Sequence, residues 1–468
     1  MAVYSKKIIQ SAKGNFMFSF PIKLIICSIQ FLSTVNYCPA QNTTLNVDVY
    51  MQAHVQNRHF SGAVLIAKKG EILLRKGYGM ANDERAVPIS PETKFRIASL
   101  TKSFTAMAIM QLEEAGKLSL SDAVSKHLPD YPRGDEMTLF QVLHHTAGIP
   151  DMLQLPAYWE KLQDTCTAAE AVDIFKYEPL HFDPGSEWEY SNSGYVLLGY
   201  IIETITGKQL CDYFNEHIFI PLMMSGTGWE SATPIENFGA SGYHLEAQRR
   251  VAMPSINMSV NHGAGALFST IDDLYKWDRA LYSNKLLGAE EMKKIFTPHL
   301  NAYGGGWGIM QHQRFGKEII FMNGRFSGFS ANISRYPGDD LCIIVLSNLM
   351  DTDPRIIADN LAGIIFEEIA VCPQKRERTE VPLEILEQYA GVYFFEKTNP
   401  PLTVEILLDD ENKLVRKING RTDKELIPSS VNTFYYETAD VDIVFENGKT
   451  GTMIMNLLGT PYWGEKIN

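Results

Sequence analysis

The strongest signal for the fold of this chain lies in the stretch Phe95-Arg96-Ile97-Ala98-Ser99-Leu100-Thr101-Lys102. Residues 95–98 have the pattern of a short strand, and they are followed by the apolar segment 105–112, which is typical of a buried helix. Positions i and i+3 share one face of a helix, so the Lys102 amine can lie beside the Ser99 hydroxyl. The N-terminus of such a helix also offers free N–H groups to a negatively charged oxygen.

Ser99 and Lys102 form the only Ser-x-x-Lys pattern of the sequence. A serine hydroxyl is a poor nucleophile unless a neighbouring base removes its proton, and this pattern brings a serine and an amine together. A pattern of two residues also arises by chance, and Ser99 could merely cap the helix while Lys102 is solvated. The pattern therefore needs support from other segments before it indicates a catalytic serine.

A second group of polar residues, Tyr190-Ser191-Asn192, precedes the apolar run 196–203, which is typical of another buried helix. A phenol has a pKa of about 10, and it can act as a base near neutral pH if a lysine ammonium lowers that pKa. Asn192 can donate a hydrogen bond to a substrate carbonyl. The same three letters recur at Tyr282-Ser283-Asn284, where they follow an amphipathic helix and indicate a turn.

Strand and helix patterns surround these residues on both sides. Residues 62–67 and 72–76 predict a hairpin, and the segment 99–300 is mostly helical in period. A closing helix is expected near 354–370, after strands at 307–313, 318–323, 328–336 and 341–347. This order predicts an α+β fold, in which one antiparallel sheet is assembled from both chain ends and flanked by a helical subdomain.

The remainder of the chain predicts a second, smaller domain. Residues 372–382 are charged and contain two prolines, which is typical of a linker after a first domain at 41–371. About seven short β-runs with turn signals such as Asn447-Gly448 follow in 383–468. Their spacing predicts a small antiparallel β-barrel.

Residues 1–40 have the pattern of a signal peptide. Lysines precede the apolar run 24–32, which is too short to span a bilayer, and the small residues Cys38 and Ala40 predict cleavage after Ala40. Met17 could be the true start, because 17–40 alone forms a complete signal, and a retained anchor is the alternative. The sequence therefore predicts a periplasmic or secreted protein.

The composition is that of a globular protein, with 45% hydrophobic and 21% charged residues among 468. The length predicts two or three domains. A net charge of −13 argues against a nucleic-acid or anionic-membrane partner. Neither a zinc site nor a disulfide scaffold is expected, because the cysteines beyond residue 40 are widely spaced: Cys166, Cys211, Cys342 and Cys372.

Together these segments resemble the serine β-lactamase and penicillin-recognising family, specifically its class C β-lactamase, D-alanyl-D-alanine carboxypeptidase and esterase branch. The resemblance covers about residues 45–370 and includes three further segments, 143–150, 263–270 and 323–330. It implies that Ser99 is the nucleophile, Lys102 its proton partner and Tyr190 the general base and then acid. It also implies that Asn192 contacts the substrate amide. Residues 383–468 resemble the lipocalin-like barrel appended to many such hydrolases.

The family's third motif falls at Met322-Asn323-Gly324, followed by Arg325, and the resemblance implies that these residues bind substrate. The first position is usually Lys or His, which faces the tyrosine and the substrate carboxylate, and methionine supplies neither a charge nor a donor. An oxyanion hole from the N–H groups of Ser99 and Arg325 needs no particular side chain. Arg325 could compensate for Met322, although strand alternation would send its side chain to the opposite face.

Two other patterns point away from ligand chemistry. The run Gly304-Gly305-Gly306-Trp307-Gly308 lacks the Gly-Lys-Ser/Thr ending of a phosphate loop and predicts a close-packed turn. His144 and His145 are adjacent, so on a helix they point to different faces, and no His-Glu-x-x-His pattern accompanies them. We therefore expect them to be core or surface histidines rather than metal ligands.

The resemblance implies an exported serine hydrolase that forms an acyl-enzyme on D-alanyl peptides of cell-wall type, small esters or β-lactams. It implies no metal and no organic cofactor, and the sequence is silent on oligomeric state. One alternative, motivated by Met322, is a peptidoglycan-binding or signalling pseudoenzyme of the same fold. Another is a lipid-binding or scaffolding role led by the barrel, although small barrels are commonly filled by their own side chains.

Overall fold

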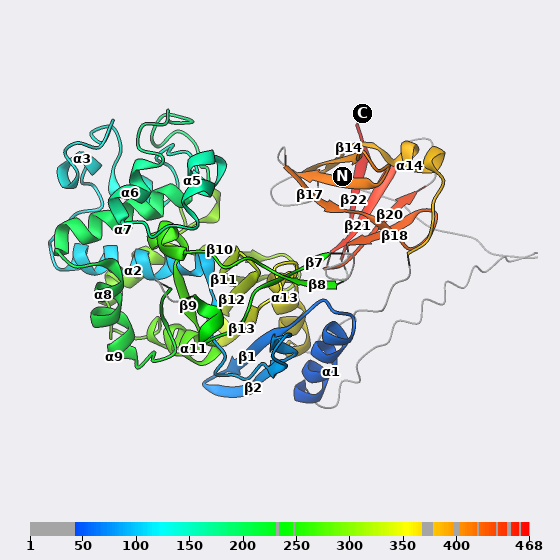
Figure 1. Cartoon of the computed structure of the whole chain (residues 1–468), viewed down its shortest axis with the longest axis horizontal. Helices are drawn as coiled ribbons and strands as arrows, with labels where there is room; N and C mark the ends of the chain where they lie inside the picture. Colours follow the sequence, from blue (N-terminus) through cyan, green and yellow to red (C-terminus); the bar gives the residue numbers. More distant parts are fainter. Residues whose placement is uncertain are drawn as a thin grey trace, which may run out of the picture. The chain divides into compact units, whose positions relative to one another are not determined.

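The computed structural model (Figure 1) describes residues 43–230, 234–246, 249–366, 378–396, 402–418, 421–436, 439–446, 451–457 and 460–467. The predicted signal peptide, Cys372, most of the predicted linker and the Asn447-Gly448 turn lie outside these residues. Within them, no helix combines the length and the apolar character that crossing a membrane requires.

A six-stranded sheet lies among the helices of residues 43–366, in the order β10-β11-β12-β13-β1-β2. Every neighbouring pair is antiparallel, and β1 joins the two chain ends because it pairs with both β2 and β13. The predicted hairpin, the four later strands and the sheet built from both ends are confirmed. The strands are β1 (Gly62–Lys68), β2 (Glu71–Tyr78), β10 (Gly308–His312), β11 (Lys317–Phe326), β12 (Phe329–Tyr336) and β13 (Leu341–Ser347).

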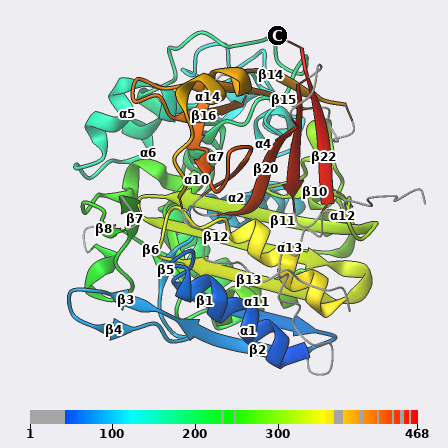
Figure 2. The same cartoon turned by 90° about the vertical axis from the view of Figure 1, so that its right-hand side faces the viewer.

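Helices cover both faces of this sheet. On one face, α1 (Thr43–Gln56) and α13 (Pro354–Ile365) pack side by side (Figure 2). On the other face, α11 (Ile271–Ala280) contacts β1 and β13. Side chains alternate along β1, so Val64 and Ile66 join the core under α1 and α13 while their neighbours join the opposite core. The predicted closing helix is confirmed as far as Ile365.

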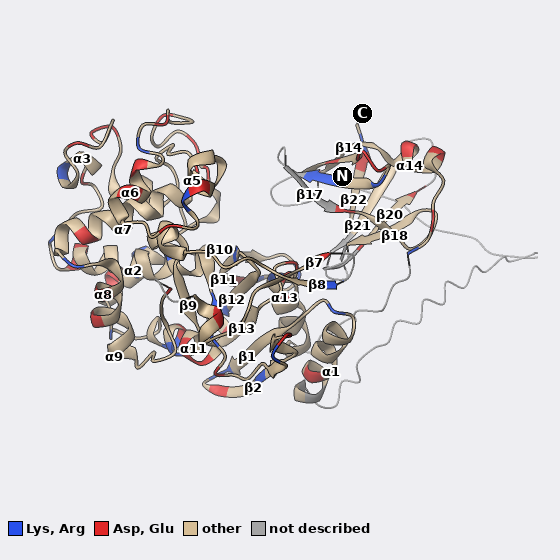
Figure 3. Cartoon of the chain, in the orientation of Figure 1, with Lys and Arg blue, Asp and Glu red and all other residues tan. Residues whose placement is uncertain are grey.

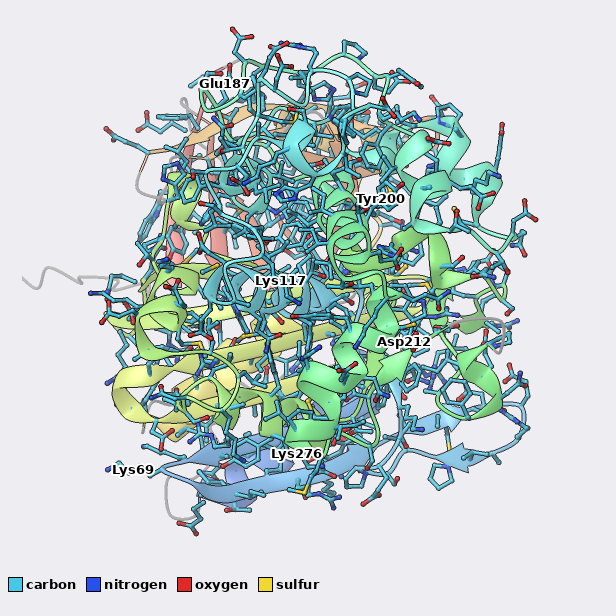
Figure 4. The ribbon with its side chains drawn as sticks, turned by 90° about the vertical axis from the view of Figure 1, so that its left-hand side faces the viewer. Lys69, Lys117, Glu187, Tyr200, Asp212 and Lys276 are labelled. Carbon is cyan, nitrogen blue, oxygen red and sulfur yellow. The ribbon has the colours of Figure 1, made fainter. Side chains whose placement is uncertain are left out.

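The helical subdomain is built around α2 (Thr101–Glu114) and α7 (Asn192–Thr206), both of which are mostly buried. They coincide with the two apolar runs that predicted buried helices. Figure 4 looks onto this helical side, with Tyr200 of α7 labelled. The other helices here are α3 (Val124–His127), α4 (Leu139–Leu143), α5 (Pro156–Lys161), α6 (Ala168–Asp173), α8 (Leu210–Phe214), α9 (Ile220–Leu222), α10 (His262–Gly265) and α12 (Ala289–Ile295).

Short strands interrupt the helical part, and the sequence patterns did not predict most of them. A three-stranded sheet has the order β5-β9-β6. Strands of two to four residues are too short to show a hydrophobic period. The sequence therefore predicted only the strand-like residues at β5. The strands are β3 (Met80–Asn82), β4 (Val87–Pro88), β5 (Phe95–Arg96), β6 (Gly228–Trp229), β7 (Tyr243–Glu246), β8 (Arg249–Ala252) and β9 (Leu267–Ser269).

Charged residues of both signs are spread over the helices and strands (Figure 3). One buried ion pair bears on the site, because Arg96 of β5 donates two hydrogen bonds of 2.6 Å to the Glu230 carboxylate. Breaking such a buried pair is expensive, because the remaining charge loses its partner. The pair therefore anchors the strand that leads directly to Ser99.

The C-terminal part of the described chain contains α14 (Leu383–Tyr389), which is followed by an antiparallel sheet in the order β17-β16-β15-β14-β22-β21-β20-β19-β18. Its two edge strands, β17 and β18, are separated only by Leu426, so the sheet forms a nearly closed barrel, as predicted. A cluster of buried side chains that includes Tyr393, Phe434 and Phe445 fills its interior. The strands are β14 (Gly391–Phe395), β15 (Leu402–Leu408), β16 (Leu414–Ile418), β17 (Arg421–Glu425), β18 (Ile427–Pro428), β19 (Thr433–Tyr436), β20 (Ala439–Glu446), β21 (Thr452–Leu457) and β22 (Thr460–Lys466).

Candidate active site

Ser99 lies in a 3₁₀ turn, Ala98–Leu100, that leads directly into α2. Its neighbour Ala98 has a φ of +44°, in the left-handed region that non-glycine residues rarely adopt. Gly324 of β11 packs against the same turn, and a Cβ there would lie 2.2 Å from the Ile97 carbonyl oxygen and 3.1 Å from the Ser99 nitrogen. Glycine therefore lets the third-motif strand approach the backbone of Ser99.

The Lys102 amine is fully buried and surrounded by three oxygen atoms. Its Nζ lies 3.1 Å from Ser99 Oγ, 2.7 Å from Asn192 Oδ1 and 2.9 Å from the Ala264 carbonyl oxygen. The Asn192 and Ala264 oxygens can only accept hydrogen bonds, so they take the two N–H groups of a neutral Lys102 amine. The lone pair of that amine then faces the Ser99 hydroxyl. Burial lowers the pKa of Lys102 to about 7, against an opposing effect of Asp151.

Asp151 determines how the Asn192 side chain is oriented. Asn192 Nδ2 lies 3.1 Å from each oxygen of the Asp151 carboxylate, so the amide oxygen is turned toward Lys102. We expected Asn192 to donate to a substrate carbonyl, whereas its amide group in this structure donates to Asp151. Sequence reasoning missed Asp151, although it directly follows the segment 143–150 that carries part of the family resemblance.

Tyr190 immediately precedes the N-cap residue of α7. Its ring centroid lies 4.9 Å from Lys102 Nζ, and the Ser99 hydroxyl is close enough to lower the pKa of the phenol against the larger effect of burial. Burial raises the pKa of Tyr190 well above 10, which is the opposite of the expected lowering. The phenol therefore stays protonated near neutral pH, where it can donate its proton to an oxygen or nitrogen atom that becomes basic during the reaction.

His145 packs behind the phenol, with ring centroids 4.5 Å from Tyr190 and 4.6 Å from Tyr303. Its Nδ1 accepts a hydrogen bond from the Ser191 N–H at 3.2 Å. Burial and the nearby Lys102 lower the pKa of His145 well below 6.5, so the ring is neutral. His144 is buried too, and both histidines serve packing, as expected. The part of the chain that the structure describes holds no cluster of three His, Cys, Asp or Glu able to bind a metal.

A cavity of 420 Å³ opens at Ser99, and we call it the serine cavity. It brings together most of the residues singled out in the sequence: Ser99, Tyr190, Asn192, Asn323, Gly324 and Arg325. The Arg325 guanidinium donates a hydrogen bond of 3.1 Å to the Thr352 carbonyl oxygen. Met322 does not line this cavity; it is buried, and side chains alternate between buried and exposed from 322 to 325.

Two sequence patterns outside the cavity have packing roles. Gly306 has a φ of +78°, and a Cβ there would lie 2.7 Å from the Lys102 carbonyl oxygen, so the glycine run is a close-packed turn, as predicted. The second Tyr-Ser-Asn follows α11, where the Ser283 hydroxyl donates to the Ala280 carbonyl oxygen at 2.8 Å. The Tyr282 ring lies over the Arg335 guanidinium at 4.6 Å. This segment therefore forms a turn, as expected.

Comparisons with known proteins find relatives in sequence and in fold. The sequence profile described as Beta-lactamase matches residues 47–365. Penicillin-binding protein 4* of Bacillus subtilis (strain 168) is 28% identical over 436 residues, which cover 87% of this chain and 95% of that protein. The crystal structure of a penicillin binding protein from Bacillus halodurans is 26% identical with a TM-score of 0.60, covering 67% of this chain and 98% of that one. D-amino acid amidase from Ochrobactrum anthropi SV3 is 25% identical with a TM-score of 0.59, covering 69% and 97%.

Proposed function

Because this chain belongs to the beta-lactamase family, we propose that it is a serine hydrolase in which Ser99 forms an acyl-enzyme. The family match confirms the resemblance that the Ser-x-x-Lys segment suggested. The observation that carries the proposal is the contact of 3.1 Å between Lys102 Nζ and Ser99 Oγ. The other two contacts of the amine are with oxygens that only accept hydrogen bonds, which leaves its lone pair for the Ser99 proton. Similarity to penicillin-binding proteins and to a D-amino acid amidase supports a hydrolytic reaction.

In the proposed acylation, Ser99 Oγ attacks the substrate carbonyl carbon and its proton passes to the neutral Lys102 amine. The oxyanion that forms accepts hydrogen bonds from the N–H groups of Ser99 and Arg325. The bond to the leaving oxygen or nitrogen breaks while that atom takes a proton from the Tyr190 phenol, which recovers one from the Lys102 ammonium. Water then attacks the acyl-enzyme through the same groups, and the acid is released as Ser99 regains its proton.

Intact-mass analysis after incubation with a fluorescent penicillin, a fluorophosphonate and p-nitrophenyl esters tests this proposal. We expect a covalent adduct on Ser99 with at least one of the three, and the reagent that reacts assigns the substrate class. A pseudoenzyme of the same fold would bind without forming an adduct. The absence of any adduct, with the protein folded, would refute the hydrolase proposal.

The pH dependence of the reaction should follow Lys102. Its pKa of about 7 means that the amine is protonated below that pH, so kcat/KM should rise as pH increases through about 7. The Asp151 carboxylate raises this pKa, so Asp151→Asn should move the rising limb to lower pH. Measured pH profiles of kcat/KM decide the point. Asp353→Asn is the matched control, because Asp353 also lines the serine cavity but its side chain caps α13. The rising limb of the kcat/KM profile of this variant should lie at the same pH as that of the wild type. A shift to higher pH in Asp151→Asn would contradict the assignment of this limb to Lys102.

Met322 should set the preference between neutral and charged substrates. Where the family usually has Lys or His, a charge-assisted hydrogen bond to the substrate carboxylate contributes about 1.5–3 kcal/mol. Without it, we expect neutral esters or amides to be preferred over β-lactams and carboxypeptidase substrates. Met322→His should raise kcat/KM for a carboxylate-bearing substrate about tenfold to a hundredfold and leave a simple neutral ester little changed. Equal effects on both substrates would contradict this role of position 322 and would favour Arg325 as the partner of the substrate carboxylate.

Export is part of the proposal and rests on residues 1–40, whose pattern is that of a signal peptide. Mass analysis of the protein recovered from expressing cells tests it. We expect a mature N-terminus at Gln41, and a chain that keeps its first forty residues would favour a retained anchor.

A further inference from the structure

A second cavity, of 350 Å³, lies next to the serine cavity, and we call it the apolar cavity. Its walls come from three parts of the chain: the loop before α7, the segment 301–308 and the strands β10 and β11. Besides Tyr190 and Ala302, its apolar and aromatic side chains are Trp188, Tyr303, Met310, Phe321 and Met322. None of the described residues that line it carries a charge.

The two cavities share part of their walls. Tyr190 and Asn323 line both, whereas Ser99 and Asn192 line the serine cavity alone. The apolar cavity therefore lies on the side of Tyr190 that is remote from the nucleophile. A substrate whose reacting carbonyl is at Ser99 would reach the apolar cavity along this shared wall, past Tyr190 and Asn323.

The place of Tyr190 indicates which part of the substrate faces this second cavity. In the reaction proposed above, the phenol gives its proton to the departing oxygen or nitrogen atom. The group attached to that atom must then lie beside the phenol, on the side away from the bond to Ser99. We propose that the apolar cavity binds an apolar leaving group, such as an aryl-alkyl alcohol or amine; this inference rests on the proposed function.

The size and chemistry of the cavity fit such a group. An apolar cavity of about 150 Å³ is large enough to hold benzene, so 350 Å³ accommodates an aromatic ring with its linking atoms. Met322 occupies the position at which the family usually has Lys or His. A methionine there keeps the wall of the apolar cavity free of charge. Binding an apolar ring here removes apolar surface from water on both partners.

Two esters of one acid, methyl butyrate and benzyl butyrate, test the assignment, because their alcohols have similar acidity and differ mainly in the ring. We expect kcat/KM to be about tenfold or more higher for the benzyl ester. Met310→Asp should lower the benzyl-to-methyl ratio at least about fivefold, because it places a carboxylate in the wall of the cavity. Met310 is 42% exposed on the edge strand β10, so the substitution is compatible with folding, and Met310→Ser offers a milder second variant.

Met223→Asp is the matched control, because Met223 is 73% exposed and lines neither cavity, and it should keep the wild-type ratio. A wild-type ratio near one, or a ratio that Met310→Asp leaves unchanged, would overturn the subsite. If Met310→Asp instead alters discrimination between methyl butyrate and methyl phenylacetate, the cavity binds the acyl side and the leaving-group assignment is wrong. If the wild type hydrolyses neither ester in a Ser99-dependent manner, the subsite is overturned. The proposed function is overturned with it only if none of the three covalent reagents labels Ser99.

Discussion

Ser99→Ala should abolish turnover of every ester or amide substrate, by about four orders of magnitude or more, while the fold stays intact. The substitution removes the hydroxyl that attacks the carbonyl, and no other hydroxyl lies within hydrogen-bond distance of Lys102 Nζ among the described residues. Only one partly exposed oxygen is lost from the start of a helix, and losing a cap costs about 1 kcal/mol. Steady-state kinetics and a thermal melt of the same sample check both parts.

Ser103→Ala is a matched control for that experiment. Ser103 is four residues further along the same helical segment, where its hydroxyl donates to the Leu100 carbonyl oxygen at 2.8 Å and lines no part of the serine cavity. We expect Ser103→Ala to keep its activity. If Ser99→Ala retains more than a trace of turnover, Ser99 is not the nucleophile.

Lys102→Ala and Tyr190→Phe should each lower the acylation rate by about two orders of magnitude or more, the usual scale for a positioned proton-transfer group. Their combined loss should be far from additive, because both serve one proton relay. Single-turnover acylation of each variant and of the double variant measures this. Lys102→Ala should also lower stability by about 1–3 kcal/mol, because the Asn192 and Ala264 oxygens lose a buried donor.

Tyr282→Phe provides the matched control for the phenol. Tyr282 belongs to the other Tyr-Ser-Asn of the chain, follows α11 and is 44% exposed, so losing its hydroxyl should leave acylation unchanged. If Tyr282→Phe is the damaging change and Tyr190→Phe is harmless, the proton relay has been assigned to the wrong tyrosine.

Much of the architecture could be predicted from local patterns. The apolar runs at 105–112 and 196–203 became the buried helices α2 and α7, and the alternating runs after 306 became β10 to β13. The short strands β6 to β9 escaped prediction, because two to four residues carry no hydrophobic period of their own. In addition, β6 and β9 pair with partners distant in sequence, whereas β7 and β8 pair locally with each other. The domain limits at 41–371 and 383–468 remain predictions.

The pairing of Ser99 with Lys102 follows from the amino-acid order alone, because three residues along a helix return to the same face. The contacts of the Lys102 amine with Asn192 and Ala264 cannot be read from the amino-acid order, because these residues lie 90 and 162 residues from Lys102 along the chain. Sequence reasoning therefore expected a lysine that lowers the pKa of Tyr190, whereas burial lowers the pKa of Lys102 and raises that of the phenol. A pKa depends on how much water and charge surround a group, and only the packing of distant segments sets both. The apolar cavity beside Tyr190 arises in the same way, because its walls come from segments that meet only in the folded chain.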